Sequence, residues 1–210
     1  ASDVYKRQDL CMGSKADEPI NRRLAMFVPF YMQEYFNKAQ IVDKEGQTRP
    51  LVAKEEKIVI TGKTPADFVS GGITPMQSAS LLLILVAGIS IYGIRRGKTL
   101  WGIDLILFLI AGMAGCILAF LALFSQHPAV SPNYILFVFH PFHLFCLPFM
   151  LSRVRKREIS RYMLVNFAVL TLFIGLWTII PQRIPPAVLP LALCLLIRSA
   201  SNLILTYKRR

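Results

Sequence analysis

Five apolar stretches follow one another between residues 76 and 206 of this chain. Each is close to the ~20 apolar residues that an α-helix needs to cross the hydrocarbon core of a bilayer. We therefore expect an all-α membrane protein, a five-transmembrane-helix bundle preceded by a small α+β extramembrane segment. The predicted spans run from about 76 to 94, 102 to 124, 134 to 152, 160 to 181 and 187 to 206.

The connections between these stretches alternate in charge. The second connection, Ser125 to Asn133, has no Lys or Arg, and the fourth has only Arg183. Cationic connections are retained on the cytoplasmic side of a membrane. We therefore expect a multi-pass protein with residues 1 to 72 outside the cytoplasmic membrane and the C-terminus inside. The basic groups are Arg95, Arg96 and Lys98 in the first connection, Arg153, Arg155, Lys156, Arg157 and Arg161 in the third, and Lys208, Arg209 and Arg210 at the end.

The net charge of +12 lies almost entirely in the membrane part. Residues 73 to 210 hold 13 basic and 2 acidic side chains, whereas residues 1 to 72 hold 11 basic and 10 acidic ones. These cations flank apolar spans and do not line one polar face, so no nucleic-acid partner is expected. Membrane lipids with anionic headgroups are the expected partners.

Residues 1 to 72 have a soluble, charge-balanced composition. Apolar residues at helical spacing between Asn21 and Ala39 predict an amphipathic helix interrupted near Pro29, followed by strands at 39–42, 50–53 and 57–61. So few large apolar groups favour the tail of a larger domain. We expect a longer parent chain with its own signal peptide. Residues 1 to 8 resemble a translated sequencing adapter, and we assign them no function.

Asp104 and Arg198 are charged residues well inside predicted spans, where the cost of burying a charge in the membrane implies a role for each. Asp104 in the second span and Arg198 in the fifth lie at similar depth, and Asn166 and Asn202 fall in the same layer. We expect a buried polar cluster on the cytoplasmic half. It is either an ion pair that fixes helix register, a path for substrate or protons, or a set of independently snorkelling side chains.

A second polar group collects towards the outer surface: His127, Asn133, His140 and His143. Pro141 between the two span histidines predicts a helix kink. The histidines would bond to backbone freed by that kink, bind a metal, or contact lipid headgroups or an acyl chain. No partner for a metal has matching spacing, and no metal or other cofactor is expected. Small residues in the second span predict a close helix contact: Ala111, Gly112, Ala114 and Gly115.

The chain resembles the C-terminal part of bacterial Lnb-type lipoprotein N-acyltransferases, over about residues 9 to 207. Five spans fit that family. The resemblance implies a bacterial inner-membrane protein whose residues 1 to 72 end a papain-like periplasmic domain and whose residues 73 to 210 form the membrane domain. The matching residues are Asp9, Leu10, Met12, Gly13, Ser14, Asp17, Met26, Phe27, Pro29, Phe30, Tyr31, Trp101, Gly102, Asp104, Gly112, Gly115, Cys116, Ser125, His127, Pro128, Pro132, Asn133 and Pro141 to Leu144.

The resemblance also implies acyl transfer to the amino group of a lipoprotein's N-terminal cysteine, through a thiol nucleophile and a histidine. The family's cysteine precedes a Thr-Arg-Pro triplet. Here Thr48 to Pro50 form that triplet, but Gly46 occupies the cysteine's place. We therefore expect no catalytic residue among residues 1 to 210, and Cys11 matches a later, noncatalytic segment. His140 departs from the asparagine that the family has before the proline.

The resulting hypothesis is a membrane domain that anchors a periplasmic thiol-dependent catalytic domain and guides lipid or lipoprotein substrate. A non-enzymatic membrane scaffold would lack a lipid-sized groove between spans. A small transporter would place Asp104 and Arg198 along a water-accessible cavity.

Overall fold

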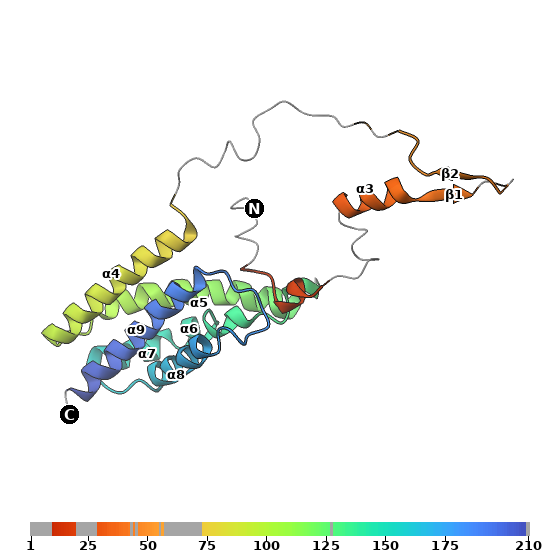
Figure 1. The fold of residues 1–210 in the computed structure, drawn as a ribbon. Coiled ribbons are helices and arrows are strands. Elements are labelled where there is room, and N and C mark those ends of the chain that lie inside the picture. The colour runs from red at the N-terminus through yellow and green to blue at the C-terminus, as the bar shows by residue number, and fades with distance from the viewer. Residues whose placement is uncertain are drawn as a thin grey trace. The chain divides into compact units, whose positions relative to one another are not determined.

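The computed structural model describes residues 10–19, 29–42, 44, 46–54, 56, 73–126 and 128–208 (Figure 1). Its contacts divide the chain into two compact units. One unit contains residues 18–68, and the other joins residues 1–17 to residues 69–210. Leu10 to Asp17 therefore pack with the apolar helices, although the composition changes near residue 72.

The smaller unit contains one helix and one hairpin. Helix α3, Pro29–Lys38, begins at the predicted interruption, and strands β1, Gln40–Val42, and β2, Thr48–Pro50, pair antiparallel. Gly46 in the turn has φ 81°, a left-handed conformation that costs glycine little. The predicted hairpin is confirmed, with its second strand starting two residues early. The first part of the predicted helix and the strand at 57–61 lie outside the described residues.

Three long helices form the framework of the larger unit: α4, Pro75–Arg96, α5, Trp101–Phe124, and α9, Val188–Tyr207. Each is long and apolar enough to cross a membrane, which confirms three of the predicted spans. Thr74 and Gln77 begin α4 with a reciprocal capping box, and Gly97 ends it in the left-handed conformation with φ 62°.

The third predicted span is broken. It consists of η4, Tyr134–Phe137, then α6, Phe142–Phe145, and α7, Leu147–Lys156, with a bend of 77° between its two parts. Pro141 and Pro148 each lack the N–H that would continue the ladder of helical hydrogen bonds. The described residues thus hold three helices that are long and apolar enough to cross a membrane, or four such spans if the bent pair counts as one.

The fourth predicted span contains the shorter helix α8, Arg161–Gly175, capped by the Ser160 side chain. Its 15 residues rise only ~22 Å at 1.5 Å each, short of a bilayer core. Turns continue the chain from α8 to Pro181. The count of five crossings is therefore not confirmed by these helices.

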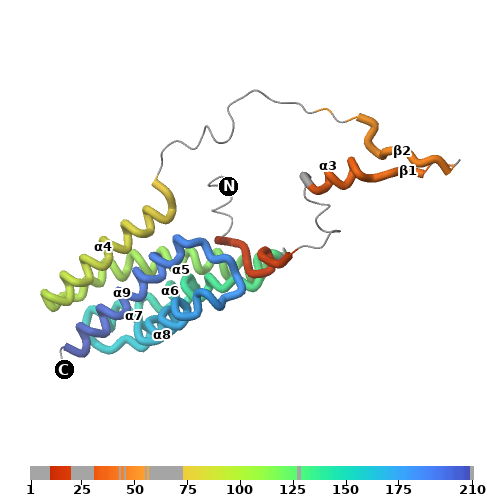
Figure 2. The backbone as a smooth tube through the Cα atoms, in the orientation of Figure 1, coloured from red at the N-terminus to blue at the C-terminus, as the bar shows by residue number. Residues whose placement is uncertain are grey.

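Helix α9 packs between α4 and α8, and α5 packs against α6 and α7 (Figure 2). A single apolar core joins them, whereas large apolar side chains cover the outside of α4, α5 and α8 as a lipid-facing surface would require. Core members include Phe108, Leu118, Ile135, Met150, Met163, Leu170, Val188 and Leu195.

Two basic connections meet at one end of the helices. Arg157 donates to the Gly97 carbonyl, and the Arg155 guanidinium lies 3.7 Å from the centre of the Trp101 ring. We call this the basic end; it contains the last turns of α4, α7 and α9 and the first turns of α5 and α8. The opposite end contains η3, Pro128–Val130, and the starts of α4 and α9.

Candidate functional site

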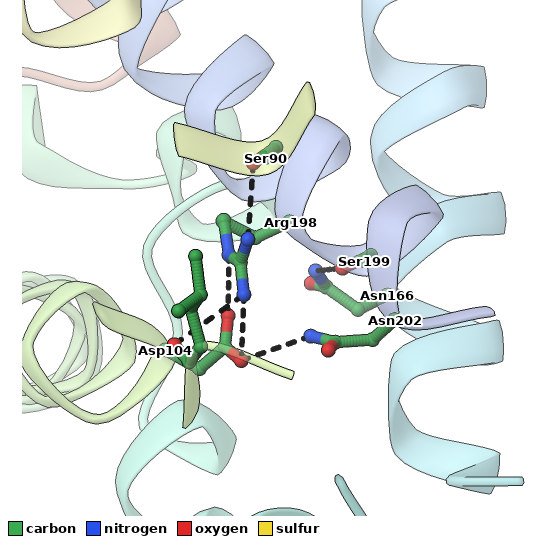
Figure 3. A network of polar contacts seen from close by, with 7 residues as sticks. Ser90, Asp104, Asn166, Arg198, Ser199 and Asn202 are labelled. Atoms are coloured by element: carbon green, nitrogen blue, oxygen red, sulfur yellow. Dashed lines mark hydrogen bonds and ion pairs between the residues drawn. The ribbon is translucent and has the colours of Figure 1, made fainter. Parts of the chain in front are cut away.

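The buried polar cluster centres on one ion pair. Arg198 Nε lies 2.7 Å from Asp104 Oδ1, and Arg198 Nη2 lies 3.0 Å from Asp104 Oδ2 (Figure 3). The contact is bidentate, the geometry in which a planar guanidinium matches a carboxylate. Asp104 is 0% and Arg198 1% exposed, so both charges are removed from solvent.

Two further side chains form hydrogen bonds with this ion pair. Arg198 Nη1 donates to Ser90 Oγ of α4 at 3.0 Å, and Asn202 Nδ2 donates to Asp104 Oδ2 at 3.0 Å. Asn166 of α8 instead donates to Ser199 Oγ at 2.9 Å, one position along α9 from the arginine (Figure 3). The cluster therefore connects α4, α5 and α9, and an adjacent bond adds α8.

Such an arrangement can hold four helices in one register. A buried ion pair is retained only when its remaining donors and acceptors find partners, and here Ser90 of α4, Asn202 of α9 and the Leu100 carbonyl supply them. Three buried oxygens next to the pair have no hydrogen-bond partner among the described residues: Asn166 Oδ1, Ser201 Oγ and Asn202 Oδ1.

The two span histidines lie at the break of the third span. His143 Nε2 is 2.9 Å from the Val138 carbonyl, and His143 Nδ1 is 2.6 Å from the Tyr162 hydroxyl. Because a carbonyl only accepts, Nε2 carries the proton and Nδ1 accepts from Tyr162. His143 thus donates a hydrogen bond to a carbonyl that the broken helix leaves without a helical partner. Its bond with Tyr162 joins the third predicted span to α8.

His140 stacks on His143, with ring centroids 3.9 Å apart. No described group bonds to His140 Nδ1. The predicted small-residue face of α5 explains why the break fits here. A Cβ on Gly115 would lie 2.5 Å from the His140 carbonyl carbon, and one on Gly112 would lie 2.7 Å from the Leu144 nitrogen. Only glycine admits the irregular segment this closely.

At the end of the bundle opposite the basic end, the side chains of Asn133 and Gln182 bind the segment Leu10 to Asp17. Gln182 Nε2 donates to the Met12 carbonyl at 2.9 Å and to Asn133 Oδ1 at 3.2 Å, while its Oε1 accepts from the Tyr134 N–H at 2.7 Å. Asn133 Nδ2 donates to the Leu10 carbonyl at 3.2 Å.

Backbone bonds continue this attachment. The Gly13 N–H donates to the Ala129 carbonyl at 2.7 Å, and the Ser14 N–H donates to the Pro132 carbonyl at 2.8 Å. Asp17, at the end of η1, Ser14–Asp17, accepts from the Arg183 N–H at 2.7 Å. The segment is therefore fixed on the helix ends along its length.

An apolar groove of about 770 Å³ lies beside this attachment, between the first turns of α4 and the segment leading into α9. Ligand-binding clefts measure about 300–1,000 Å³. The solvent-exposed residues Met76 and Pro186 line the groove, and Ser78 contributes a polar side chain to its lining. The remaining walls are mainly apolar: Leu10, Ala79, Leu82, Val188 and Leu191.

The structure brings Asp104, Arg198 and Asn202 into one cluster and places Asn166 beside it. His140 and His143 lie together, Asn133 belongs to the N-terminal attachment, and His127 lies outside the described residues. Among the described residues no three His, Cys, Asp or Glu side chains gather as metal ligands would.

Sequence reasoning missed the partners Ser90, Tyr162, Gln182 and Ser199. Ser and Tyr are ordinary residues in spans, so nothing in their pattern marked them. Gln182 carried a weak signal, because it is an amide between Pro181 and Arg183 in an otherwise apolar connection.

Comparison with protein families matches most of the chain to a known membrane domain. The model of the Lnb transmembrane domain matches residues 67–210. No curated protein and no solved structure matches the chain.

Proposed function

Since this chain belongs to the family of the Lnb transmembrane domain, we propose that it holds a periplasmic, thiol-dependent acyltransferase domain at the outer leaflet of the bacterial inner membrane. The membrane domain also guides a lipid substrate towards that domain. The lipid is a phospholipid or the lipid-bearing end of a lipoprotein. The acyl-transfer chemistry belongs to the parent enzyme, and residues 1 to 210 supply anchoring and guidance.

The observation that carries this proposal is the apolar groove. It lies at the end of the helices opposite the basic end, as a groove for lipid in the outer leaflet would. Its volume suits an acyl chain, and its walls offer that chain mainly apolar side chains. A scaffold without a lipid substrate has no need of such a groove.

Leu10 links this groove to the extramembrane part of the chain. Leu10 lines the groove, and its carbonyl accepts a hydrogen bond from Asn133. A lipid in the groove would therefore touch the segment that leads to residues 18–68. This arrangement supports delivery of lipid to a domain on the same side of the membrane.

The proposed orientation follows from the cationic connections. The basic end faces the cytoplasm, the N-terminal segment is periplasmic, and the chain crosses five times, with the bent pair and α8 each completing one crossing. Turns after Gly175 and a locally thinned bilayer would compensate for the short α8.

A transporter that uses Asp104 and Arg198 is the less supported function. The guanidinium is bonded to Asp104, Ser90 and, at 3.5 Å, the Leu100 carbonyl. An arginine of α9 that is bonded to α4 and α5 is suited to packing more than to a moving charge.

Photo-crosslinking tests the proposal. Membranes containing the chain are supplied with a phospholipid that carries a diazirine on its acyl chain, and the adducts are mapped by mass spectrometry. We expect adducts on Met76 or Leu82 in the groove, and Ser78→Phe, which fills it, should reduce them about tenfold. A ten-fold change corresponds to about 1.4 kcal/mol of lost binding.

Ile84→Phe is the matched control, because Ile84 lies on the same helix, is 69% exposed and does not line the groove. Its groove adducts should equal those of the unmodified chain. Adducts spread evenly over the lipid-facing surface, or groove adducts that Ser78→Phe leaves unchanged, would refute guidance by this groove.

A further inference from the structure

A second hollow, of about 910 Å³, lies at the basic end where α7 turns into α8. Its lining includes both cationic and apolar side chains. Arg153, Lys156 and Arg161 contribute cationic groups, whereas Phe149 and Ile159 contribute apolar ones. We call it the α7–α8 pocket.

The two kinds of lining are ordered along α7. Phe149, Ser152, Arg153 and Lys156 follow the spacing of one helical face. Phe149 is 76% exposed and lies towards the middle of the bundle, and the charged residues follow towards the basic end. An elongated molecule in the pocket would thus contact an apolar surface at one end and cations at the other.

The cations of this connection have separate roles. Arg155 covers the Trp101 ring and Arg157 bonds to the Gly97 carbonyl, so both join α7 to the turn between α4 and α5. The other three basic residues line the pocket with one carboxylate, Glu158, which lies 2.5 Å from Arg153. The lining therefore carries three cations and one anion, a formal charge of +2.

From this lining we infer that the α7–α8 pocket binds the headgroup of an anionic phospholipid. The phosphate lies between Lys156 and Arg161, and the start of an acyl chain lies along Phe149. Basic pockets between helix ends at the cytoplasmic face select such lipids. A soluble phosphate would leave the apolar half of the pocket without a partner, and a zwitterionic lipid would gain less from the positive charge.

This site does not depend on the acyl groove, because the two lie at opposite ends of the helices. It would retain one lipid of the inner leaflet at the junction of α7 and α8. That lipid would stabilise the turn which follows the broken span.

The test compares lipids added to the whole chain in a neutral detergent. Phosphatidylglycerol should raise the melting temperature at lower concentrations than phosphatidylcholine, because a ligand that binds only the folded state stabilises it. In Lys156→Gln/Arg161→Gln the phosphatidylglycerol concentration for half of this effect should rise about thirtyfold, because two cations that would contact the headgroup are lost. Sodium phosphate alone should have no effect.

Arg95→Gln/Arg96→Gln is the matched control, since it removes the same charge at the basic end but outside the pocket. It should respond to phosphatidylglycerol as the unmodified chain does. Equal losses in the two double variants would mean diffuse attraction and would refute the site. Equal effects of the two lipids would refute anionic selectivity, and stabilisation by sodium phosphate would assign the pocket to a soluble anion.

Discussion

Arg198 and Asp104, 94 positions apart in the chain, form a bidentate contact at 2.7 and 3.0 Å inside the helix bundle. Arg198 is on α9 and Asp104 is on α5. The pair fixes the depth of these helices relative to each other, and Ser90 extends the constraint to α4. The first prediction follows from this geometry.

Arg198→Met should destabilise the bundle by about 3–5 kcal/mol, because it leaves a buried carboxylate without its cation. Asp104→Leu should cost a similar amount. The double variant Asp104→Leu/Arg198→Met should lose less than the sum, since neither charge then remains. Denaturant titration in mixed micelles, followed by circular dichroism, measures each free energy of unfolding.

Additive losses would show that the two charges are not coupled. A double variant that is as stable as the unmodified chain, but that abolishes the proposed acyl transfer, would favour a direct functional role for the pair over a structural one.

Gly115→Ala should lower the melting temperature of the detergent-solubilised chain. The new Cβ would lie 2.5 Å from the His140 carbonyl carbon, so α5 and the broken span must move apart. Such overpacking costs about 1–3 kcal/mol. Gly88→Ala is the control, because nothing lies within 4 Å of its Cβ, and in a helix alanine is favoured over glycine by about 0.5–1 kcal/mol. A matching loss in both variants would contradict the close approach.

Gln182→Ala should release Leu10 to Asp17 from the helix ends. The amide donates directly to the Met12 carbonyl, and its two other hydrogen bonds, to Asn133 and from the Tyr134 N–H, position the asparagine that holds the Leu10 carbonyl. Each of these bonds has a net worth of about 0.5–1.5 kcal/mol. Trypsin should then cleave after the exposed Lys15 at least about tenfold faster, because cleavage follows the population of the open form. Gln126→Ala, in an exposed position at the same end, should leave the rate unchanged. An unaltered rate in Gln182→Ala would show that the segment is held by other contacts.

Cysteine labelling checks the proposed orientation. In intact cells with a permeable outer membrane, Gln126→Cys should react with a membrane-impermeant maleimide, whereas Lys208→Cys should react only after the inner membrane is opened. Both positions are exposed, and they lie at opposite ends of the bundle. Labelling of the unmodified chain gives the background from its own four cysteines. The reverse pattern would invert the topology.

Much of the fold was predictable from the sequence. Apolar length places α4, α5 and α9 within a few residues, because a helix satisfies its own backbone hydrogen bonds and needs no distant partner. The apolar length of 134–152 likewise predicts one regular helix, whereas the structure breaks it into η4, α6 and α7. Hydropathy counts apolar residues and does not register that Pro141 and Pro148 remove backbone donors.

The candidate site was partly predictable for a related reason. The cost of charge in a membrane singled out Asp104 and Arg198, and similar depth suggested that they meet. Depth alone does not specify rotation about the helix axis. The choice of Asn202 for the carboxylate and of Asn166 for Ser199 therefore depended on how α8 and α9 pack.

By itself the sequence determined that the chain is a membrane protein, where three of its helices run and which connections are basic. These properties depend on local composition, since the transfer of each side chain into lipid is largely independent of its neighbours. Only the tertiary structure decided that Leu10 to Asp17 attach to the helix ends, that His143 bonds to Val138 and Tyr162, and that an apolar groove lies beside Leu10. Those contacts join residues far apart in the chain, and their existence depends on relative helix positions that no local pattern encodes.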